Sequence, residues 1–521
     1  MEDMKASLVI LALVGLTLAS CGDPGALAAE DAYPTRLVLS DDHPGSGFHP
    51  ATGYGQTGVS PIYDGLLRPE PGEQGRLPHF APALAAQLPT HNADATEWTV
   101  QLKKDIQFTD GTALDSSDVV ASYRTAQDIS AGSEVASSYE AITSIEAPDA
   151  HTVVFRLAFP LSEFSDRLTY PITPSEKQGL VELNADPVGT GAYKFSERRG
   201  DDTIFTANPK YWGGEVPIKE LVITATGDDS ARAQRVINGD FHGAVIPSLH
   251  ATKYLDNAKV RVDVAKGADW RAISLPATKE LRDPRVRCAL NIGTNRQALI
   301  DGPFAGYGSA AATPIPDFYG AAHNPEATFE FDANKANALL DEAGLHRGAD
   351  GTRFSLELYY PGQDSGRRDL AVQFAAQMRE LGISVEPKAG TWDDITPRMT
   401  EIAVVLGGGE MPYDVSMSAY NQLHTRTLTT SPYDNPGNYG SPELDALVDS
   451  ARGQVDVTTR DSLWRAAQEK YVANPSLIMV GTVDHVYLSR PNSWVKPDLM
   501  LEPHIHGATW GPWWNLAEWK R

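Results

Sequence analysis

Apolar and polar positions along the chain follow two periods. His151–Leu157 and Phe354–Leu358 alternate between apolar and polar residues, which is typical of a strand with one buried face. Asp332–Leu345 repeats its apolar residues at helical spacing, with an aspartate that can cap the first turn and Gly344 near its end. The two periods together predict a mixed α/β fold.

Strand and helix patterns follow one another in the second half of the chain. Phe354–Leu358 predicts a strand, Ala371–Leu381 predicts a helix that stops before Gly382, and Ile383–Glu386 predicts another strand. Two strands joined by a helix are usually parallel, because the helix carries the chain back to the edge where the first strand began. We therefore expect a mostly parallel sheet in this half of the molecule.

The first residues differ from all that follow. Lys5 precedes an apolar run, Leu8–Leu18, which is too short to span a bilayer comfortably and is followed by small residues. We expect residues 1–20 to be a signal peptide. The run ends in Leu-Ala-Ser-Cys, which resembles the lipidation motif of bacterial lipoproteins and implies an acyl anchor on Cys21, with ordinary cleavage beside an incidental cysteine as the alternative. Residues 21–34 then predict a tether.

Composition narrows the range of functions. The chain has 521 residues, too many for one core, so two or three packed units are expected. Its formal charge of −24 argues against a nucleic-acid partner, which would require clustered Lys and Arg. The chain has two cysteines, and if Cys21 carries a lipid, Cys288 alone can form neither an intramolecular disulfide nor a cysteine-based metal site.

A motif with strong turn signals lies between residues 186 and 214. Asp186-Pro-Val-Gly-Thr-Gly-Ala192 predicts a tight turn with glycines at positive φ, and Asn208-Pro-Lys-Tyr-Trp-Gly-Gly214 predicts a second turn. Together they resemble a signature of the extracellular solute-binding proteins of ABC importers, in the peptide/nickel family (family 5). The physical reading without that resemblance is a hairpin with turn residues.

Further motifs resemble the same family in the same order. They include a turn followed by a helix start at Phe108–Gly111 and Asp115–Val120, and a segment rich in arginine at Leu281–Asn291. The helix pattern of Asp332–Leu345 and the segment Asn438–Asp445 also match. The resemblance covers roughly residues 36 to 490.

The resemblance implies a two-lobed α/β fold of the class II periplasmic-binding-protein (venus-flytrap) type, with a small subdomain inserted in the N-terminal lobe. It places lobe I at residues 35–270 and 485–521, the insert at about residues 60–190, and lobe II at residues 271–484. The tryptophans of the segment from 502 to 515 are expected to pack this segment back onto lobe I.

The resemblance also implies a function. Such proteins close two lobes around a solute and deliver it to a membrane permease, so we expect a monomeric, lipid-anchored receptor outside the cytoplasm that needs no cofactor. The residues agree, because no serine-hydrolase elbow, zinc-protease motif, Walker loop or dinucleotide fingerprint is present. We therefore expect a protein that is not an enzyme. A catalytic hydrolase is the remote alternative, and a receptor that signals to a sensor protein is another.

The ligand is harder to predict. Peptide binders of the family carry an acidic residue in a loop of lobe II that pairs with the peptide ammonium group, yet no acidic residue occurs from Val415 to Pro432. The resemblance leaves Tyr54, Trp392, Tyr420 and Asn421 as candidate ligand-binding residues. An oligopeptide or a related small solute is the expected ligand.

A metal chelate is the alternative ligand. In the nickel and metallophore branch of the family, a histidine of the same loop contacts the chelated metal and an arginine faces the chelator, and His424 and Arg167 fall in these regions. A bare ion would require several protein ligands, whereas a saturated chelate needs one or none. His504 and His506 also have a spacing that can hold a metal on a strand, although a surface position is the simpler interpretation.

Overall fold

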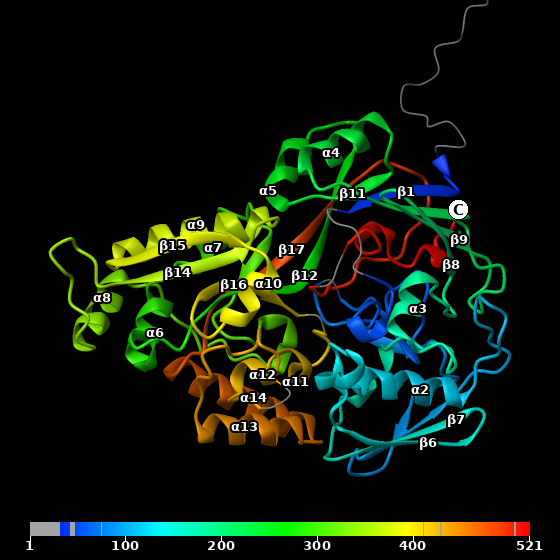
Figure 1. Ribbon diagram of the computed structural model, residues 1–521, viewed down its shortest axis with the longest axis horizontal. Helices are drawn as coiled ribbons and strands as arrows, with labels where there is room; N and C mark the ends of the chain where they lie inside the picture. Colours follow the sequence, from blue (N-terminus) through cyan, green and yellow to red (C-terminus); the bar gives the residue numbers. More distant parts are fainter. Residues whose placement is uncertain (1–31, 42–46, 74, 410, 428–429, 505–506) are drawn as a thin grey trace, which may run out of the picture.

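The computed structural model describes residues 32–41, 47–73, 75–409, 411–427, 430–504 and 507–521. The molecule has two α/β lobes, and the predicted signal peptide and Cys21 lie outside the described residues (Figure 1). One large sheet runs through both lobes in the order β15-β14-β16-β12-β17-β11-β1-β10-β9-β8. Among the described residues, no helix is long and apolar enough to cross a membrane.

Lobe I forms around parallel strands at the N-terminal end of the chain. β1 pairs in parallel with β10 and β11, and β9 and β8 extend the sheet as antiparallel strands. Helix α4 follows β10 in the sequence, and helix α5 follows β11. The bounds are β1 (Arg36–Asp41), β8 (Tyr193–Arg199), β9 (Asp202–Ala207), β10 (Glu220–Ala225), α4 (Asp229–Asn238), β11 (Gly243–Val245) and α5 (Ser248–Ala251).

The segment between β1 and β8 forms a subdomain with its own core. A four-stranded sheet of order β4-β5-β7-β6 packs against α2, and Trp98, Tyr123 and Phe155 are among its buried residues. This agrees with the predicted insert. The bounds are β2 (Leu67–Glu70), β3 (His79–Pro82), β4 (Thr90–His91), β5 (Glu97–Gln101), α2 (Ser116–Gln127), β6 (Ile142–Asp149), β7 (Thr152–Leu157) and α3 (Leu180–Ala185).

Lobe II contains the predicted parallel strands. β14 pairs in parallel with both β15 and β16, and α9 joins β14 to β15 as the alternation of patterns predicts. The bounds are α6 (Pro284–Ile292), α7 (Arg296–Asp301), β13 (Gly308–Ala310), α8 (Ala333–Glu342), β14 (Phe354–Pro361), α9 (Ser365–Glu380), β15 (Ile383–Gly390), α10 (Trp392–Ile395), β16 (Ala403–Gly408), α11 (Val415–Ser418), α12 (Tyr420–Leu423), α13 (Pro442–Arg452) and α14 (Val457–Ala473).

Two long strands connect the lobes. β12 (Arg261–Ser274) and β17 (Leu477–Ser489) pair antiparallel along most of their length, and both cross between the lobes in Figure 1. The pairing is interrupted between Ala265 and Asp269. The predicted lobe boundaries at 270–271 and 484–485 fall inside these two strands.

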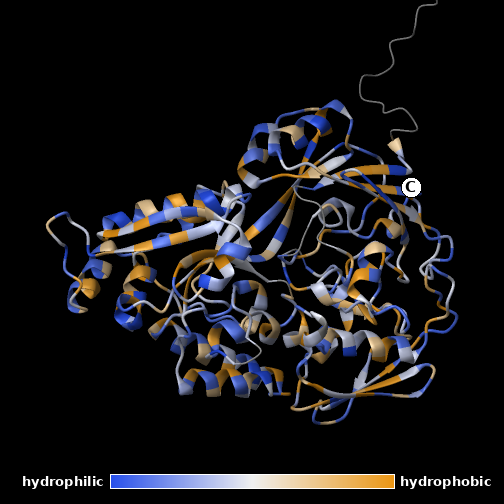
Figure 2. Ribbon diagram, viewed as in Figure 1, coloured by the Kyte–Doolittle hydropathy of each residue, from blue (hydrophilic) through white to orange (hydrophobic). Residues whose placement is uncertain are grey.

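Apolar residues collect in the interior of each unit. In Figure 2, apolar and polar residues alternate along many strands and helices, as expected where one face is buried. One cluster fills lobe II and another fills the insert. In lobe I, Trp510, Trp513 and Trp514 are buried in the cluster that also holds Leu37 and Leu39, so the C-terminal segment packs on lobe I as predicted.

The glycines of the turn after residue 186 are required by close backbone packing, and not by the positive φ that was predicted. Gly189 and Gly191 do not adopt positive φ. A β-carbon on Gly191 would instead lie 2.7 Å from the carbonyl oxygen of Pro61. The N–H of Gly191 donates to the carbonyl of Ile62 at 2.8 Å. The backbone of the insert approaches lobe I too closely here for any side chain.

Candidate functional site

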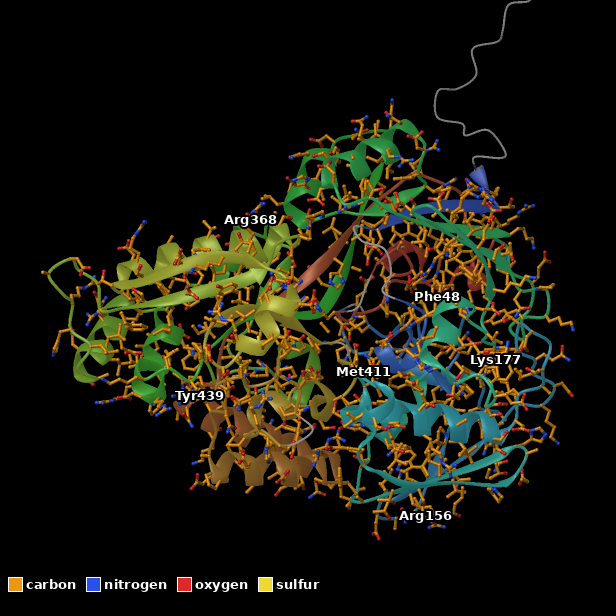
Figure 3. The ribbon with its side chains drawn as sticks, in the orientation of Figure 1. Phe48, Arg156, Lys177, Arg368, Met411 and Tyr439 are labelled. Atoms are coloured by element: carbon orange, nitrogen blue, oxygen red, sulfur yellow. The ribbon has the colours of Figure 1, made fainter. Side chains whose placement is uncertain are left out.

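A cavity of about 1250 Å³ lies between the two lobes. This is larger than the roughly 300–1,000 Å³ of common small-molecule sites. Lobe I contributes the ends of β10 and β11 and the first residues of α4 and α5, and lobe II contributes the start of α9 and the loop from β15 into α10. Figure 3 labels Arg368, a wall residue, at the end of α9 that approaches lobe I.

The strands between the lobes form the floor of this cavity. Arg271 of β12 and Val483–Val486 of β17 line it, at the place where the two strands leave one lobe and enter the other. A solute in the cavity would therefore contact both lobes and the strands that join them.

A buried network of charged groups supports the floor. Asp269 is fully buried and forms an ion pair with Arg271. The Nε2 of His485 lies 3.1 Å from the other oxygen of Asp269, and its Nδ1 lies 2.8 Å from Glu502. Tyr487 Oη and the Gly511 N–H also donate to Glu502, at 2.5 and 2.7 Å. The network joins β12, β17 and the C-terminal segment.

The network fixes the protonation of two of its members. Burial by itself would lower the pKa of His485, but its hydrogen bonds to Asp269 and Glu502 outweigh burial and raise this pKa to about 9. Burial would raise the pKa of Asp269, yet the charges of Arg271 and His504 and its hydrogen bonds to His485 and His504 hold it well below its usual range. His485 is therefore a cation and Asp269 an anion at neutral pH.

Two arginines and a histidine converge over one glycine beside the floor. A β-carbon on Gly407 would lie 2.7 Å from Arg271 Nη1 and 2.9 Å from His504 Cε1, and it would also collide with Arg367 Nη2. His504 Nδ1 lies 2.7 Å from Asp269, and its Nε2 lies 3.5 Å from Arg367.

The remaining wall is partly apolar and partly acidic. Phe304, Pro361 and Trp392 line it from lobe II, and the guanidinium of Arg367 lies 5.7 Å from the ring centre of Trp392. Carboxylates occur on both sides of the cavity, namely Asp201, Asp229, Asp364, Asp369, Asp394 and Asp484. The cavity thus offers guanidinium groups, an aromatic ring and carboxylates to one ligand.

Among the predicted ligand-binding residues, Trp392 lines this large cavity. Tyr54 does not. It packs in the core of lobe I against Phe48 and Tyr63, and burial raises the pKa of its hydroxyl above the ordinary range. Tyr54 therefore supports the loop in which it lies, and its contact with a ligand stays a prediction.

Arg167 lies in the contact between the insert and lobe II. Its Nη1 forms a buried ion pair with Asp414 at 2.7 Å, its Nη2 donates to Ser416, and its Nε donates to the carbonyl of Ser138. Asp414 directly precedes the stretch from Val415 to Pro432, which contains no acidic residue. The acidic residue of this loop therefore faces an arginine of the other lobe.

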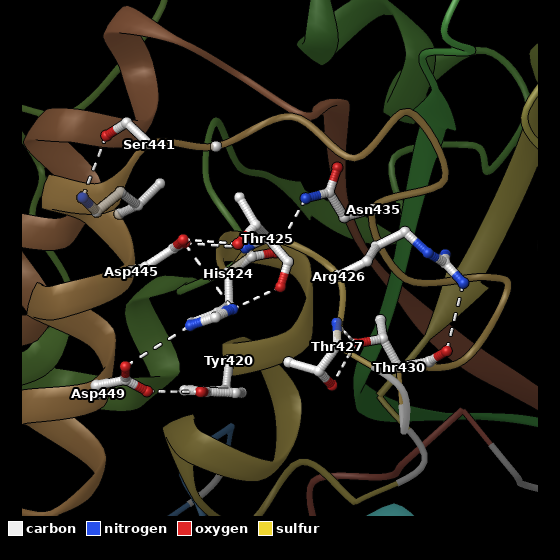
Figure 4. Close-up of polar contacts among 12 residues, drawn as sticks. Tyr420, His424, Thr425, Arg426, Thr427, Thr430, Asn435, Ser441, Asp445 and Asp449 are labelled. Carbon is white, nitrogen blue, oxygen red and sulfur yellow. Dashed lines mark hydrogen bonds and ion pairs between the residues drawn. The ribbon is translucent and has the colours of Figure 1, made fainter.

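The other predicted residues lie close to that ion pair. Tyr420 and Asn421 line a small pocket of about 50 Å³ together with Arg167. His424 stacks on Tyr420 and lies 3.9 and 3.7 Å from carboxylate oxygens of Asp445 and Asp449 (Figure 4). Among the described residues, no group of three or more His, Cys, Asp and Glu side chains is arranged to hold a metal ion.

Sequence reasoning did not identify the residues of the floor. A weak signal was present, because Asp269 and Arg271 flank Trp270 at the apolar end of β12, and His485 interrupts the mostly apolar sequence of β17. Buried charged residues on a central strand need partners, and those partners are often functional groups. The pairing of β12 with β17, which brings them together, is not visible in the pattern of either strand.

Comparison with known proteins identifies the family. The family model described as "Bacterial extracellular solute-binding proteins, family 5 Middle" matches residues 79–428. Protein XP55 of Streptomyces lividans is 34% identical over 457 residues, covering 84% of this chain and 82% of that protein. The glutathione-binding protein GsiB of Escherichia coli K12 is 28% identical over 409 residues, covering 74% of this chain and 77% of GsiB.

Solved structures agree on the fold. NikZ from Campylobacter jejuni in complex with Ni(L-His) superposes with a TM-score of 0.82 at 22% identity, covering 94% of this chain and 99% of NikZ. The oligopeptide-binding protein AppA from Bacillus subtilis, in complex with a nonapeptide, gives 0.77 at 19% identity, with coverage of 93% and 98%. The chain therefore belongs to family 5 of the bacterial extracellular solute-binding proteins.

Proposed function

We propose that this protein is the solute receptor of an ABC importer and that it captures an oligopeptide or a related small solute between its lobes. The observation that carries the proposal is the cavity of about 1250 Å³, which contacts both lobes and the two strands joining them. A receptor that closes on its solute requires this placement. Membership of family 5 supports it.

The chemistry of the cavity suits a peptide. Guanidinium groups complement a carboxylate, aspartates complement an ammonium group, and Trp392 and Phe304 offer apolar contact to side chains. GsiB, a relative, binds glutathione by name, and AppA was solved with a nonapeptide. The predicted contacts of Tyr54, Arg167, Tyr420, Asn421 and His424 with the ligand belong to this proposal as expectations for mutagenesis.

A metal chelate is the second candidate, and the arginines favour it as well, since metal carriers bear carboxylates. NikZ was solved with nickel and histidine. In this case His424 would be the metal-contacting residue. The chelate would bring most of its own ligands, so the protein would recognise the carrier instead of the bare ion.

The remaining parts of the proposal concern the cell. The receptor is anchored outside the cytoplasm through lipidated Cys21, acts as a monomer, and delivers solute to permease subunits without catalysing a reaction. Mass spectrometry of the mature N-terminus tests the anchor, because a diacylglycerol on Cys21 adds a defined mass. An unmodified N-terminus beyond Cys21 would contradict it.

The first experiment on the ligand is native mass spectrometry of protein purified from its own host, with metal analysis of the same sample. A series of bound peptides without stoichiometric metal is the expected result. One small carrier with one equivalent of nickel, cobalt, zinc or iron would favour the chelate instead. A covalently altered substrate released in solution would contradict the receptor function and favour a hydrolase.

A further inference from the structure

A short part of the C-terminal segment, Met500–His504, reaches from lobe I to lobe II, and we call it the strap. Met500 is buried in the apolar cluster of lobe I, whereas the next residue, Leu501, is buried in the cluster of lobe II. The chain is back on lobe I at Ala508, whose N–H donates to Asp41 of β1 at 3.0 Å. The strap therefore contacts the cores of both lobes within two residues.

The strap completes the sheet at the place where the pairing of β12 with β17 is interrupted. β12 pairs with β17 at Ala265 and again at Asp269, and the register skips residues 266–268. Within this interval the N–H of Ala268 donates to the carbonyl of Glu502 at 2.7 Å, and the N–H of Glu502 donates to the carbonyl of Lys266 at 2.8 Å. Buried backbone groups need such partners. The strap is thus a third chain beside the two strands that join the lobes.

The attachment of the strap to lobe I is deeply buried. Glu502 has 1% of its surface exposed. Its carboxylate accepts from Tyr487 Oη and from the N–H of Gly511, and it also contacts His485. Breaking this attachment would leave a buried carboxylate without its donors, which is costly. The lobe I end of the strap is therefore fixed.

The attachment to lobe II is more accessible. The N–H of His504 donates to the carbonyl of Gly409, which follows β16, at 3.0 Å. The imidazole of His504 lies between Asp269 and Arg367, with its nitrogens 2.7 and 3.5 Å from them, and 24% of this side chain is exposed. Arg367 belongs to α9 and lines the cavity. The lobe II end of the strap thus contacts the wall that has to move when the cavity opens.

We propose that the strap limits how far the two lobes separate. The contacts of Leu501 and His504 with lobe II have to break before α9 can move away from lobe I, while Glu502 keeps the strap on lobe I. The inference goes beyond the proposed receptor function, because it concerns the amplitude of the lobe motion and not the solute. It gives the C-terminal segment a mechanical role in addition to packing on lobe I.

The test measures the distance between the lobes in protein refolded from urea to remove bound solute. Spin labels are attached through Gln234→Cys on α4 and Ala376→Cys on α9, which are both exposed. Cys21→Ser and Cys288→Ser remove the native thiols, and the chain otherwise extends from residue 21 to its last residue. Pulsed electron paramagnetic resonance then gives the distribution of distances between α4 and α9.

Two variants weaken the lobe II end of the strap. His504→Ala removes a partly exposed side chain, so the variant should fold, and Leu501→Ala removes the apolar contact. Each should raise the ratio of long to short distances about tenfold, the change expected when a contact of this kind is lost from one of two states. Met500→Ala is the matched control, because it removes a buried side chain of similar size on the lobe I side and should keep the distribution of the parent.

Every variant is measured with and without Arg167→Met, so that the ion pair between the insert and lobe II cannot by itself keep the lobes together. A lower melting temperature with the parent's distance distribution in both backgrounds would show that the strap only stabilises the fold and would overturn the inference. An equal increase in long distances in Met500→Ala would overturn it as well, because the effect would then follow lost stability. The measurement needs no solute, so its outcome is independent of the test of the receptor function.

Discussion

At the scale of single residues, buried charges decide much of this structure. Asp414 has no exposed side-chain surface and Arg167 has 7%, and they join the insert to lobe II at 2.7 Å. Arg167 also donates to Ser138 and Ser416, so its guanidinium is well satisfied. Such a pair depends on both partners, because either one left alone would be a buried charge without compensation.

Removal of one partner tests this. Arg167→Met should lower the free energy of unfolding by about 3 kcal/mol, because it leaves Asp414 buried without its cation. Denaturation in urea, followed by tryptophan fluorescence, measures the change. Arg36→Met is the control. It removes an exposed ion pair with Glu220 and should leave the urea concentration at the midpoint of unfolding unchanged. An Arg167 variant as stable as the parent would contradict the role of the buried pair.

The close approach at Gly191 gives a second prediction at this scale. In Gly191→Ala, the added methyl group would collide with the backbone of Pro61 and Ile62, whose carbonyl groups accept hydrogen bonds from the N–H groups of Tyr193 and Gly191. We expect a loss of about 1–3 kcal/mol, visible as a lower melting temperature. Gly179→Ala is the matched control, since its nearest neighbour would lie 3.7 Å away at negative φ. Equal melting temperatures would refute the steric explanation.

At the scale of elements, short-range sequence signals predicted where several helices begin and end. The predicted helix start at Asp115–Val120 is confirmed, and Asp115 and Asp118 form a reciprocal capping box at the start of α2. α8 begins after the capping Asp332 as predicted, and α4 likewise ends at a glycine, Gly239. Caps and stops depend on residues within one turn, so the sequence contains the needed information.

Substitution of the two aspartates of the capping box by alanine should lower the stability of the protein to different extents. Asp115→Ala removes one local cap and should cost about 1 kcal/mol. Asp118→Ala should cost more, because Asp118 also accepts from the backbone N–H of Ser175 at 2.7 Å and ties α2 to a distant loop. Thermal unfolding of the two variants decides this. A larger effect for Asp115 would show that the contact with Ser175 contributes little.

The elements of the 413–426 loop differed from the expectation. The resemblance led us to expect a loop of lobe II here, whereas α11 and α12 are short helices. Asp414 caps α11 and at the same time pairs with Arg167. One residue thus sets both the local structure and the contact between lobes, and only the second role needs the tertiary fold.

At the scale of the whole molecule, the contact between insert and lobe II has acidic groups on both sides. Burial and the charge of Asp414 raise the pKa of Glu163 to about 8, although Arg460 lies 3.1 Å from it. The same two causes raise the pKa of Asp166 well above its usual range. If the lobes separate, Asp414 moves away and both pKa values fall toward their ordinary values.

Closure should therefore take up protons. The closed form is most favoured below the ordinary pKa of about 4.3 for a glutamate, and it loses this advantage as pH rises to about 8. Solute affinity, measured by calorimetry, should weaken from pH 5 to pH 8 by at most about tenfold per pH unit for each proton. Glu163→Gln should flatten the profile. His485 stays protonated across this range and should not contribute.

An affinity independent of pH would mean that closure does not change the environment of these carboxylates. An affinity that rises with pH would mean that their deprotonated forms stabilise the closed state. Asp166→Asn provides a second variant with the same expected direction. Arg452→Met, which removes an ion pair with Glu140 in the same contact, should lower affinity at every pH without changing the slope.

The sequence by itself determined the family, the two-lobed α/β fold, the insert, and the caps and stops of many helices, because these follow from short-range patterns and ordered motifs. It also suggested Trp392, which lines the cavity. It did not reveal the floor. Asp269, His485 and Glu502 lie up to 233 residues apart in the chain, from 269 to 502, and only the pairing of β12 with β17 and the return of the C-terminal segment bring them together. Burial then made them partners, since charges removed from water need one another.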